Sequence, residues 1–428
     1  MKWLSAEGKI DEREFCAEFI AAFPIKCIGG RIYSVDGEES GESIKAKIGE
    51  MIFQSGIKSG VATKTVNLYE ALKLYCHSDP LPISAVEIHV QNGILNTNGK
   101  FSSQKDFCIN RLNVEYVPTP GEPKHFLAYL SELLENEDIR TLQEYLGYCL
   151  IPSTKGQTAL FIIGSGGEGK SRIGAVLNSI FGKAMLTGDF HRVESDRFFR
   201  YNLINKLLMV DDDMQMSALK STGYVKSIIT AETPIDVEAK GQQSHQELLY
   251  SRFLCFGNGS PKALYDKSEG FARRLLILTT KPKPPDRVND PYIADKFIIE
   301  KNEIFLWIFK GLKRLIANNF RFTVSERARQ NLADAMTENC NIIQFLADEN
   351  YVLLGEGETA SADLYYYYSL WARRNALEPL KKHTFIAWLH DNQHRYGIQN
   401  DNHIKNNFGQ EVRGFRGIKI KPIYDRRE

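Results

Sequence analysis

The residues best suited to chemistry in this sequence lie between Gly164 and Ser171, in the segment GSGGEGKS. Their spacing is GxxxxGK(S/T), and four apolar residues before them, Leu160 to Ile163, predict a short buried strand. Apolar residues at helical spacing follow the segment. Glycines let backbone N–H groups converge on an anion, and the N-terminus of a helix adds a positive partial charge. The pattern therefore predicts a loop that binds phosphate groups.

Each position of this loop has an expected role. Lys170 would reach the β- and γ-phosphates of a nucleotide, and the hydroxyl of Ser171 would bind Mg²⁺. Glu168 is unusual here, because a carboxylate repels phosphates unless it points away from them. The predicted cofactors are ATP and Mg²⁺. The residues expected to bind the nucleotide are Gly164, Ser165, Gly166, Gly167, Glu168, Gly169, Lys170, Ser171 and Arg172.

A second predicted strand ends in three carboxylates. In NKLLMVDDDM, the apolar run Leu207 to Val210 precedes Asp211, Asp212 and Asp213. A carboxylate at the end of a neighbouring strand is what a Mg²⁺ ion needs beside a phosphate-binding loop. We expect Asp211 to belong to the Mg²⁺ shell and Asp212 to polarise the attacking water. Three consecutive aspartates leave this register open by one residue.

Two more strands contribute polar residues. Asn258 ends the apolar run of SRFLCFGN, where its amide could contact the γ-phosphate or its water. Arg273 and Arg274 precede the run LLILTT. An arginine there could enter the nucleotide site of a neighbouring subunit and neutralise charge in the transition state, or could simply form an ion pair. Arg274 is the first candidate and Arg273 the second.

The elements that must position these residues predict an α/β fold. Residues 158–280 alternate short apolar runs with helical patterns, which is typical of a parallel sheet. We expect a mostly helical region over 1–122 with a β-hairpin near 86–98. A helical lead-in beginning at Lys124 and the core that holds the loop would occupy 123–335. Residues 336–428 would form the last domain, and its tail, 360–428, reads as helix, helix and a strand pair, an order that suggests a winged helix.

Composition excludes several classes of protein. The net charge is +1, so nucleic-acid binding would have to come from a local basic surface. The seven cysteines are scattered singly, without a CxxC pair, which favours a reducing compartment over disulfides or a zinc ribbon. No apolar run is long enough to span a membrane, and charges come too early for a signal peptide. We therefore expect a cytoplasmic protein without a membrane partner.

The candidate residues are compact along the chain, since Lys170 and Arg274 are 104 positions apart (274 − 170). This spacing, with Asn258 and the segment GFARRL, resembles superfamily III helicases, and more narrowly the phage/plasmid and poxvirus primase-helicase family. VQNGILN, LQEYLGYCLIP, LYYYYSLWARRNALEPLKKHTFIAWL and FRGIKIK also resemble that family, so the match covers about residues 86–428. Only the motifs between Lys170 and Arg274 are specific.

The resemblance implies a P-loop, AAA+-like motor core followed by a winged-helix domain. It further implies a hexameric ring that hydrolyses ATP at subunit interfaces and moves 3′-to-5′ on single-stranded DNA, opening forked DNA for a phage, plasmid or mobile element. Such a protein would act in the bacterial or host cytoplasm. Residues 1–122 are too few for a primase domain, so a separate primase or origin-binding protein would be the partner.

Helicases of this kind carry a basic residue into the ring pore on a β-hairpin. The segment TPIDVEAKGQQSHQELL fits, with Lys240 at the tip and His245 as a weaker candidate for DNA binding. One lysine per subunit would form a positive collar for a DNA backbone without a basic protein. Two other classes stay open: an AAA+ origin-binding or helicase-loading ATPase without processive unwinding, and a motor that acts on protein or packages DNA.

Overall fold

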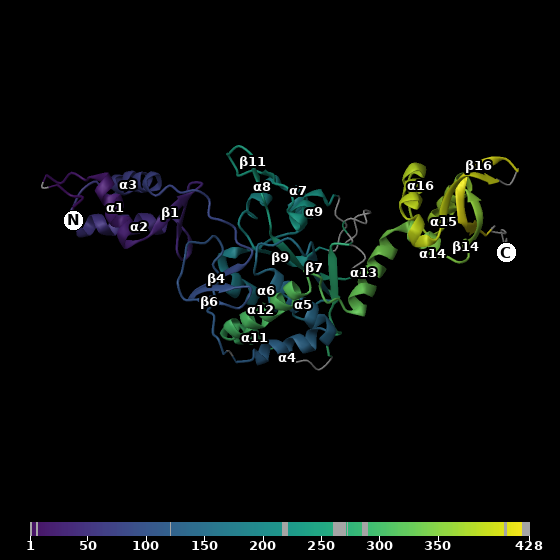
Figure 1. Cartoon of the computed structure of the whole chain (residues 1–428), viewed down its shortest axis with the longest axis horizontal. Coiled ribbons are helices and arrows are strands. Elements are labelled where there is room, and N and C mark those ends of the chain that lie inside the picture. Colours follow the sequence, from purple (N-terminus) through teal and green to yellow (C-terminus); the bar gives the residue numbers. More distant parts are fainter. Residues whose placement is uncertain are drawn as a thin grey trace. The chain divides into compact units, whose positions relative to one another are not determined.

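The computed structural model describes residues 2–5, 7–119, 121–215, 221–259, 271, 273–284, 290–405 and 409–421. The chain divides into two compact units (Figure 1). The first unit contains Met1–Ser260 and Arg273–Arg329, and the second contains Pro261–Ala272 and Gln330–Glu428. In the segment GFARRL, residues 270 and 272 lie outside the described residues.

A sheet of five parallel strands forms the centre of the first unit, which confirms the predicted parallel α/β core. The strand order is β13-β7-β12-β9-β8. Most of their residues are buried, as expected for parallel strands covered on both faces. Because the strands are parallel, their carboxyl ends meet at one edge. The strands are β7 (Ala159–Gly164), β8 (Met185–Thr187), β9 (Leu208–Met214), β12 (Arg252–Asn258) and β13 (Leu275–Thr279).

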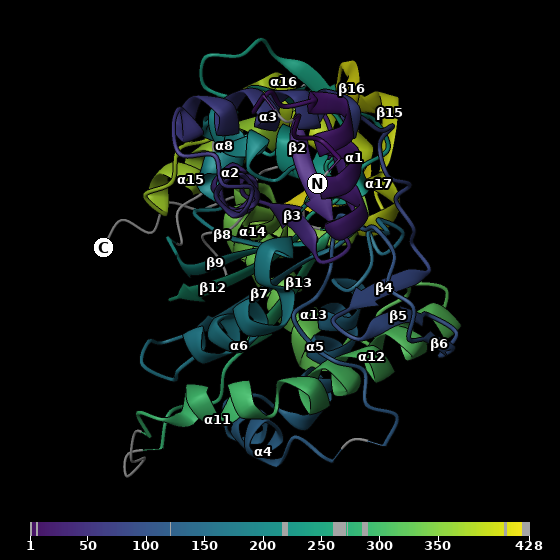
Figure 2. The same ribbon diagram turned by 90° about the vertical axis from the view of Figure 1, so that its left-hand side faces the viewer.

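Helices cover both faces of this sheet. On one face, α5, α6 and α12 share a single hydrophobic core with the strands, and they lie below β7, β9 and β12 in Figure 2. On the other face, Phe161 and Phe253 pack edge-to-face against Phe190, which precedes α7. The helices of this region are α4 (Lys124–Leu133), α5 (Asn136–Tyr148), α6 (Ser171–Phe181), the 3₁₀ turn η1 (Gly182–Ala184), α7 (His191–Ser195), α8 (Arg197–Tyr201), α9 (Gly223–Thr230), α11 (Ile293–Ile299) and α12 (Lys301–Ala317). Helix α13 (Glu326–Asn339) begins in the first unit and continues into the second.

The helical lead-in is broken into two helices. Leu134 is extended (φ −126°, ψ 158°), so α4 ends there and α5 starts at Asn136. Two acidic residues in the first turn of α5, Glu137 and Asp138, interact favourably with the positive end of the helix and help to start it.

Residues before the lead-in form two small antiparallel sheets and three helices. The sequence predicted the hairpin β4–β5 but not the sheet β1-β2-β3, whose strands are short and joined by tight turns. Gly29 and Gly30 have φ of 54° and 78°, a left-handed backbone that glycine adopts at little cost. The elements are α1 (Glu12–Ala22), β1 (Ile25–Ile28), β2 (Arg31–Ser34), β3 (Gly37–Glu39), α2 (Gly41–Gln54), α3 (Val61–Tyr75), β4 (Glu87–Val90), β5 (Gly93–Asn96) and β6 (Phe101–Ser102).

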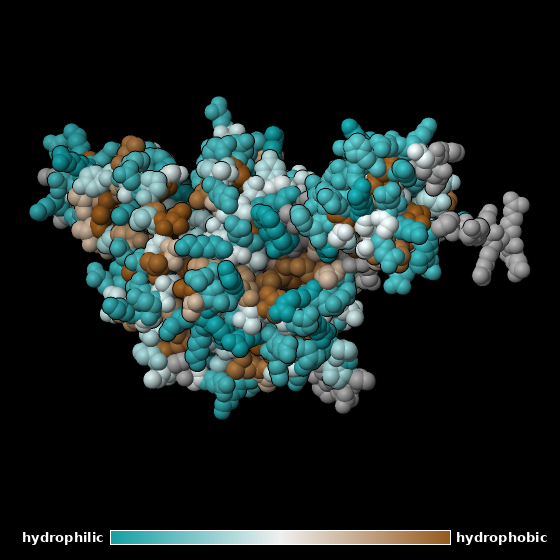
Figure 3. Space-filling view, turned by 45° about the vertical axis from the view of Figure 1, so that its right-hand side comes forward, coloured by the Kyte–Doolittle hydropathy of each residue, from teal (hydrophilic) through white to brown (hydrophobic). Residues whose placement is uncertain are grey.

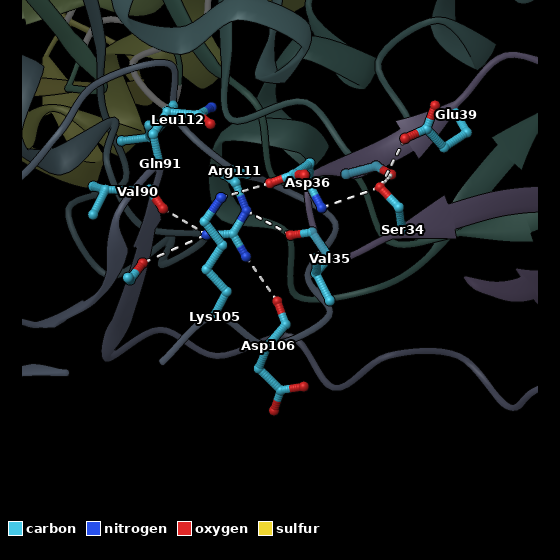
Figure 4. Close-up of polar contacts among 12 residues, drawn as sticks. Ser34, Val35, Asp36, Glu39, Val90, Gln91, Lys105, Asp106, Arg111 and Leu112 are labelled. Atoms are coloured by element: carbon cyan, nitrogen blue, oxygen red, sulfur yellow. Dashed lines mark hydrogen bonds and ion pairs between the residues drawn. The ribbon is translucent and has the colours of Figure 1, made fainter. Parts of the chain in front are cut away.

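One buried arginine joins these two sheets. The guanidinium of Arg111 donates to the carbonyls of Val35 (2.7 Å), Val90 (2.5 Å) and Asp106 (2.8 Å), and one nitrogen also lies 3.5 Å from the carbonyl of Gly93. Figure 4 shows these contacts converging on Arg111 from separate segments. A planar group with five donors is suited to this task. Arg111 therefore holds the β2–β3 turn against the β4–β5 hairpin.

The second unit has its own hydrophobic core, which includes Phe345, Tyr368, Trp371, Phe385 and Phe415. An antiparallel sheet of order β14-β16-β15 packs with the helices. The sequence predicted the last strand pair but not β14, which pairs with β16. The elements are α14 (Asn341–Ala347), β14 (Val352–Ala360), α15 (Ser361–Arg374), α16 (Lys382–Asp391), α17 (Gln393–Tyr396), β15 (Gln399–Lys405) and β16 (Glu411–Ile420).

Throughout the described ranges, no helix combines the length and apolarity needed to cross a bilayer. On the face drawn in Figure 3, hydrophobic residues form separate patches among hydrophilic ones. All seven cysteines are buried free thiols. Burial raises the pKa of Cys149 to about 12, so this thiol stays protonated and unreactive.

Candidate functional site

A cleft of about 990 Å³ opens at the carboxyl edge of the parallel sheet. This volume is in the range that holds a ligand the size of a nucleotide. The loop after β7, the ends of β9 and β12, helix α4 and the segment leading into α11 form its walls. The lining residues are His125, Ala128, Tyr129, Glu132, Gly167, Gly169, Lys170, Ser171, Arg172, Asp212, Asp213, Phe256, Asn258, Asp290, Pro291 and Ile293.

The glycines of the loop are required by its shape. Gly166, Gly167 and Gly169 have φ of 105°, 79° and 98°, a conformation that side chains strain. At Gly164 a Cβ would lie 2.5 Å from the hydroxyl of Thr280 and 2.8 Å from Nζ of Lys170. The chain can therefore curl tightly between β7 and α6, and consecutive N–H groups turn toward the inside of the curl.

Lys170 is the centre of the polar contacts in this loop. It is nearly buried, and its Nζ donates to Oδ1 of Asn258 (2.9 Å) and to Oε2 of Glu168 (2.9 Å). Nδ2 of Asn258 in turn donates to Oδ1 of Asp213 (3.3 Å). Strand β12 lies between β7 and β9, and this order brings the three strand ends together. The expected convergence of Lys170 and Asn258 is therefore present in the geometry.

Glu168 points into the loop rather than away from it. Its carboxylate accepts hydrogen bonds from the backbone N–H of Ser165 (2.5 Å) and of Gly166 (2.9 and 3.1 Å), in addition to the bond from Lys170. Burial would raise the pKa of Glu168, but the hydrogen bonds and the charge of Lys170 outweigh it and hold the pKa below its ordinary value. The carboxylate is therefore ionised at neutral pH.

The three aspartates have different surroundings. Asp211 is buried and does not line the cleft; its carboxylate accepts from the backbone N–H of Phe190 (2.7 Å) and of Asp213 (3.3 Å). Burial raises its pKa. Asp212 and Asp213 both line the cleft, and Oδ1 of Asp212 lies 3.3 Å from where a Cβ on Gly174 of α6 would stand. Asp212 and Asp213, but not Asp211, therefore present their side chains to the cleft.

A bulge in β9 accounts for Asp213 facing the cleft beside Asp212, whose side chain lies on the same face of the sheet as that of Val210. Strand β9 pairs Asp211 with Cys255 but Met214 with Gly257, so three residues on β9 match two on β12. An extra residue disturbs the alternation of side chains along a strand. As a result two consecutive aspartates face the cleft, which simple alternation from Val210 would not predict.

The sequence did not predict the wall of the cleft that is formed by helix α4 and the segment leading into α11. The hydroxyl of Tyr129 on α4 donates to the carbonyl of Gly169 (2.5 Å), and its ring packs against Phe297 of α11. His125 lies in the first turn of α4, and its ring pairs with the carboxylate of Glu300 (2.7 Å). Burial raises the pKa of Glu300, but hydrogen bonds from the backbone and side chain of His125 outweigh this and lower it. In the sequence, Tyr129 is spaced with apolar residues as part of a helix face, which predicts only a packing role. Its hydroxyl group was the one sign that it could also form a hydrogen bond at the cleft.

Residues that could hold a Mg²⁺ ion are present at the cleft. The described part of the chain contains no group of three or more His, Cys, Asp or Glu residues arranged for a metal ion. Mg²⁺, however, is usually held by one or two carboxylates together with substrate phosphates and waters. Ser171 and Asp212 both line the cleft and supply oxygen ligands of this kind.

Arg273 and Arg274 lie at the opposite edge of the sheet. The carbonyl of Arg274 accepts from the N–H of Ala159 (2.8 Å), at the start of β7, whereas the loop follows its end at Gly164. Five residues of strand span about 17 Å. Burial and the charge of Arg273 lower the pKa of Arg274, against an opposing contribution from Glu232. Neither arginine is brought to the cleft of its own chain.

Lys240 and His245 belong to a short hairpin away from the cleft. Strands β10 (Ile235–Val237) and β11 (His245–Glu247) are antiparallel, and Lys240 is exposed at the turn between them. His245 starts β11, where its ring meets Tyr201 edge-on and its Nε2 lies 3.4 Å from Glu247. Both side chains are exposed, Lys240 at the turn and His245 at the start of β11.

Comparisons with known proteins identify a fold. Residues 162–274 match a family of unknown function, DUF5906. No curated protein is similar to this chain in sequence. Solved structures of the NrS-1 C-terminal region are similar in fold. The apo structure of its residues 305–718 has a TM-score of 0.57 and 11% identity, covering 96% of this chain and 100% of that one. An A-form apo structure has a TM-score of 0.56 and 13% identity, covering 94% and 97%.

Proposed function

We propose that this chain is an ATPase whose active site is the cleft at the carboxyl edge of the parallel sheet. The observation that carries the proposal is the convergence of a glycine-rich loop, Lys170, Asn258 and two carboxylates on one cleft. The residues that meet there come from three separate strand ends, which a structural turn would not need. The residues DUF5906 matches include all of these groups.

Each residue has a role that follows from its chemistry. Lys170 neutralises charge on the β- and γ-phosphates, and the curled backbone of the loop donates N–H groups to them. Ser171 and Asp212 would hold Mg²⁺, which would supply neutralisation of phosphate charge when bound. Asp213 accepts a proton from the attacking water, and Asn258 orients the water or the γ-phosphate. These roles replace the assignment of Asp211 to the metal.

We further propose that ATP hydrolysis drives movement on DNA in replication, as in superfamily III helicases. Support comes from the spacing of the motifs and from an exposed lysine at a hairpin turn. The likeness to the NrS-1 C-terminal region over most of both chains adds support at the level of the fold. In this proposal residues 123–335 are the AAA+-like core of a hexameric ring, residues 336–428 are its winged helix, and a separate primase or origin-binding protein is the partner.

The test combines hydrolysis with strand separation. Purified protein is assayed for ATP hydrolysis with and without single-stranded DNA, and for unwinding of a duplex with a forked end. Lys170→Ala should remove hydrolysis. Lys240→Ala should keep basal hydrolysis but lose stimulation by DNA and unwinding, whereas Lys100→Ala, at another exposed turn, should behave as wild type. Hydrolysis without any unwinding would favour the origin-binding or loading ATPase, and hydrolysis at the wild-type rate by Lys170→Ala would remove the cleft from the reaction.

A further inference from the structure

The carboxylate of Glu168 occupies the inside of the loop. It receives two backbone N–H groups, from Ser165 and Gly166, and the ammonium of Lys170. These donors are of the kind that the proposed function assigns to a bound phosphate. A carboxylate and a phosphate both offer several acceptor oxygens and a negative charge, so one can substitute for the other among such donors.

The contact between Glu168 and Lys170 also gives each of these two buried charges a partner, without which burial would be strongly unfavourable. Only 3% of the Glu168 residue and 6% of Lys170 are exposed, so both charges lie largely outside water. A buried ammonium without a partner is strongly unfavourable, and Glu168 with Asn258 supplies partners for Lys170. The loop therefore has its anion-binding groups satisfied by its own chain, in a folded and prearranged state.

We propose that Glu168 is an internal ligand of the loop, which competes with nucleotide phosphates and takes their place again as the product leaves. This inference rests on the proposed function, because it concerns the same site. A phosphate can enter only if the carboxylate moves out, so part of the binding free energy is spent on that displacement. When the phosphates of ADP withdraw, Glu168 refills the loop and holds Lys170, which speeds release of the product.

The consequence is a specific pattern of affinity. Ligands that carry phosphate, such as ADP and pyrophosphate, bind less tightly than the loop would otherwise allow. Adenosine has no phosphate and is not affected. A motor gains from this arrangement, since release of product commonly limits turnover. A residue that merely supports the loop makes the opposite prediction, because its loss would loosen the loop and weaken ADP binding.

The experiment compares Glu168→Gln with wild type and with Glu137→Gln, an exposed glutamate on α5 that carries the same change of charge. Binding of ADP, pyrophosphate and adenosine is measured by titration calorimetry, and release of a fluorescent ADP by stopped flow. Glu168→Gln should bind ADP and pyrophosphate at least about tenfold more tightly and release ADP more slowly by a similar factor, because a neutral amide is a weaker competitor for these donors than a carboxylate. Adenosine binding and Glu137→Gln should be unchanged.

The outcomes separate the inference from the proposed function. Unchanged or weaker ADP binding by a folded Glu168→Gln, with ATP hydrolysis intact in wild type, overturns the internal ligand alone. Failure of wild type and both variants to bind ADP or pyrophosphate overturns both proposals. If Glu168→Gln does not fold, Glu168→Asp gives the same comparison, since its shorter side chain keeps the charge but reaches the N–H groups poorly. Steady-state kinetics add a check: KM and kcat should fall together.

Discussion

Asp211→Asn is expected to leave ATP hydrolysis largely intact, whereas Asp212→Asn is expected to remove it. The two residues are neighbours in sequence, but only Asp212 lines the cleft. The carboxylate of Asp211 is turned to the backbone N–H groups of Phe190 and Asp213. An asparagine at position 211 keeps an oxygen for the shorter of these bonds, the one of 2.7 Å from Phe190.

The size of each effect follows from these contacts. Replacing the acceptor of a charge-assisted hydrogen bond by a neutral one costs about 1 kcal/mol of the free energy of unfolding. Removing a buried charge returns part of this cost, because burial disfavours the ionised form of Asp211. We expect a fall in Tm of about 2–4 °C and less than about threefold change in kcat for Asp211→Asn. Loss of a metal-binding or proton-accepting carboxylate lowers kcat by about 10²–10⁴ for Asp212→Asn and Asp213→Asn.

The pH dependence of stability gives an independent measure. The pKa of Asp211 is raised in the folded state, so the folded protein holds this proton more tightly than the unfolded chain. Its favourable contribution is complete below the ordinary carboxyl pKa and is lost as the pH rises through the folded pKa. Wild type should therefore lose stability relative to Asp211→Asn as the pH rises above the ordinary carboxyl value of 3.8.

The assay is steady-state ATP hydrolysis at saturating Mg²⁺ with thermal melting of each variant. Asp212→Asn should melt close to wild type, because its carboxylate is exposed, and so its loss of hydrolysis would not reflect unfolding. The reasoning is refuted if Asp211→Asn melts normally and yet loses as much hydrolysis as Asp212→Asn. Such a result would favour Asp211, rather than Asp212, as the Mg²⁺ ligand.

Two further predictions concern Arg274 and Arg111, which do not line the cleft. Arg274→Ala and Lys170→Ala should each lack ATP hydrolysis alone, but a 1:1 mixture of the two should recover up to about a quarter of wild-type hydrolysis, because about a quarter of randomly formed interfaces combine both intact residues. No recovery argues against action of Arg274 on a neighbouring subunit. Arg273→Ala serves as the comparison. Arg111→Met should lower the free energy of unfolding by about 2–4 kcal/mol in chemical denaturation, because buried carbonyls lose their donor. Arg111→Lys should recover only part of this, as an ammonium cannot reach the same carbonyls at once, and equal stability of all three proteins would contradict the anchoring role of Arg111.

Much of the core could be predicted because its signals are local. A run of apolar residues, a glycine-rich turn and a helical pattern need only near neighbours in the chain, so β7, the loop and α6 follow from residues 159–181. The same holds for the hairpin β4–β5, where Asn92 lies in the turn and Gly93 begins β5. The short strands β1 to β3 carry too few residues for alternation to be recognised. Their pairing depends on contacts such as that of Arg111 with Val35, which lie far apart in sequence.

The sequence by itself determined that a glycine-rich loop, three aspartates and an asparagine would follow strands of one parallel sheet, because alternating hydrophobic runs impose that class of fold. Only the tertiary structure decided that Asp213 faces the cleft together with Asp212, since a bulge between β9 and β12 interrupts the alternation of side chains after Asp211. It also decided that Tyr129 on α4 contacts the glycine-rich loop and that the side chain of Glu168 points into that loop. Directions of this kind depend on which segments pack together, and no spacing within a single segment contains that information.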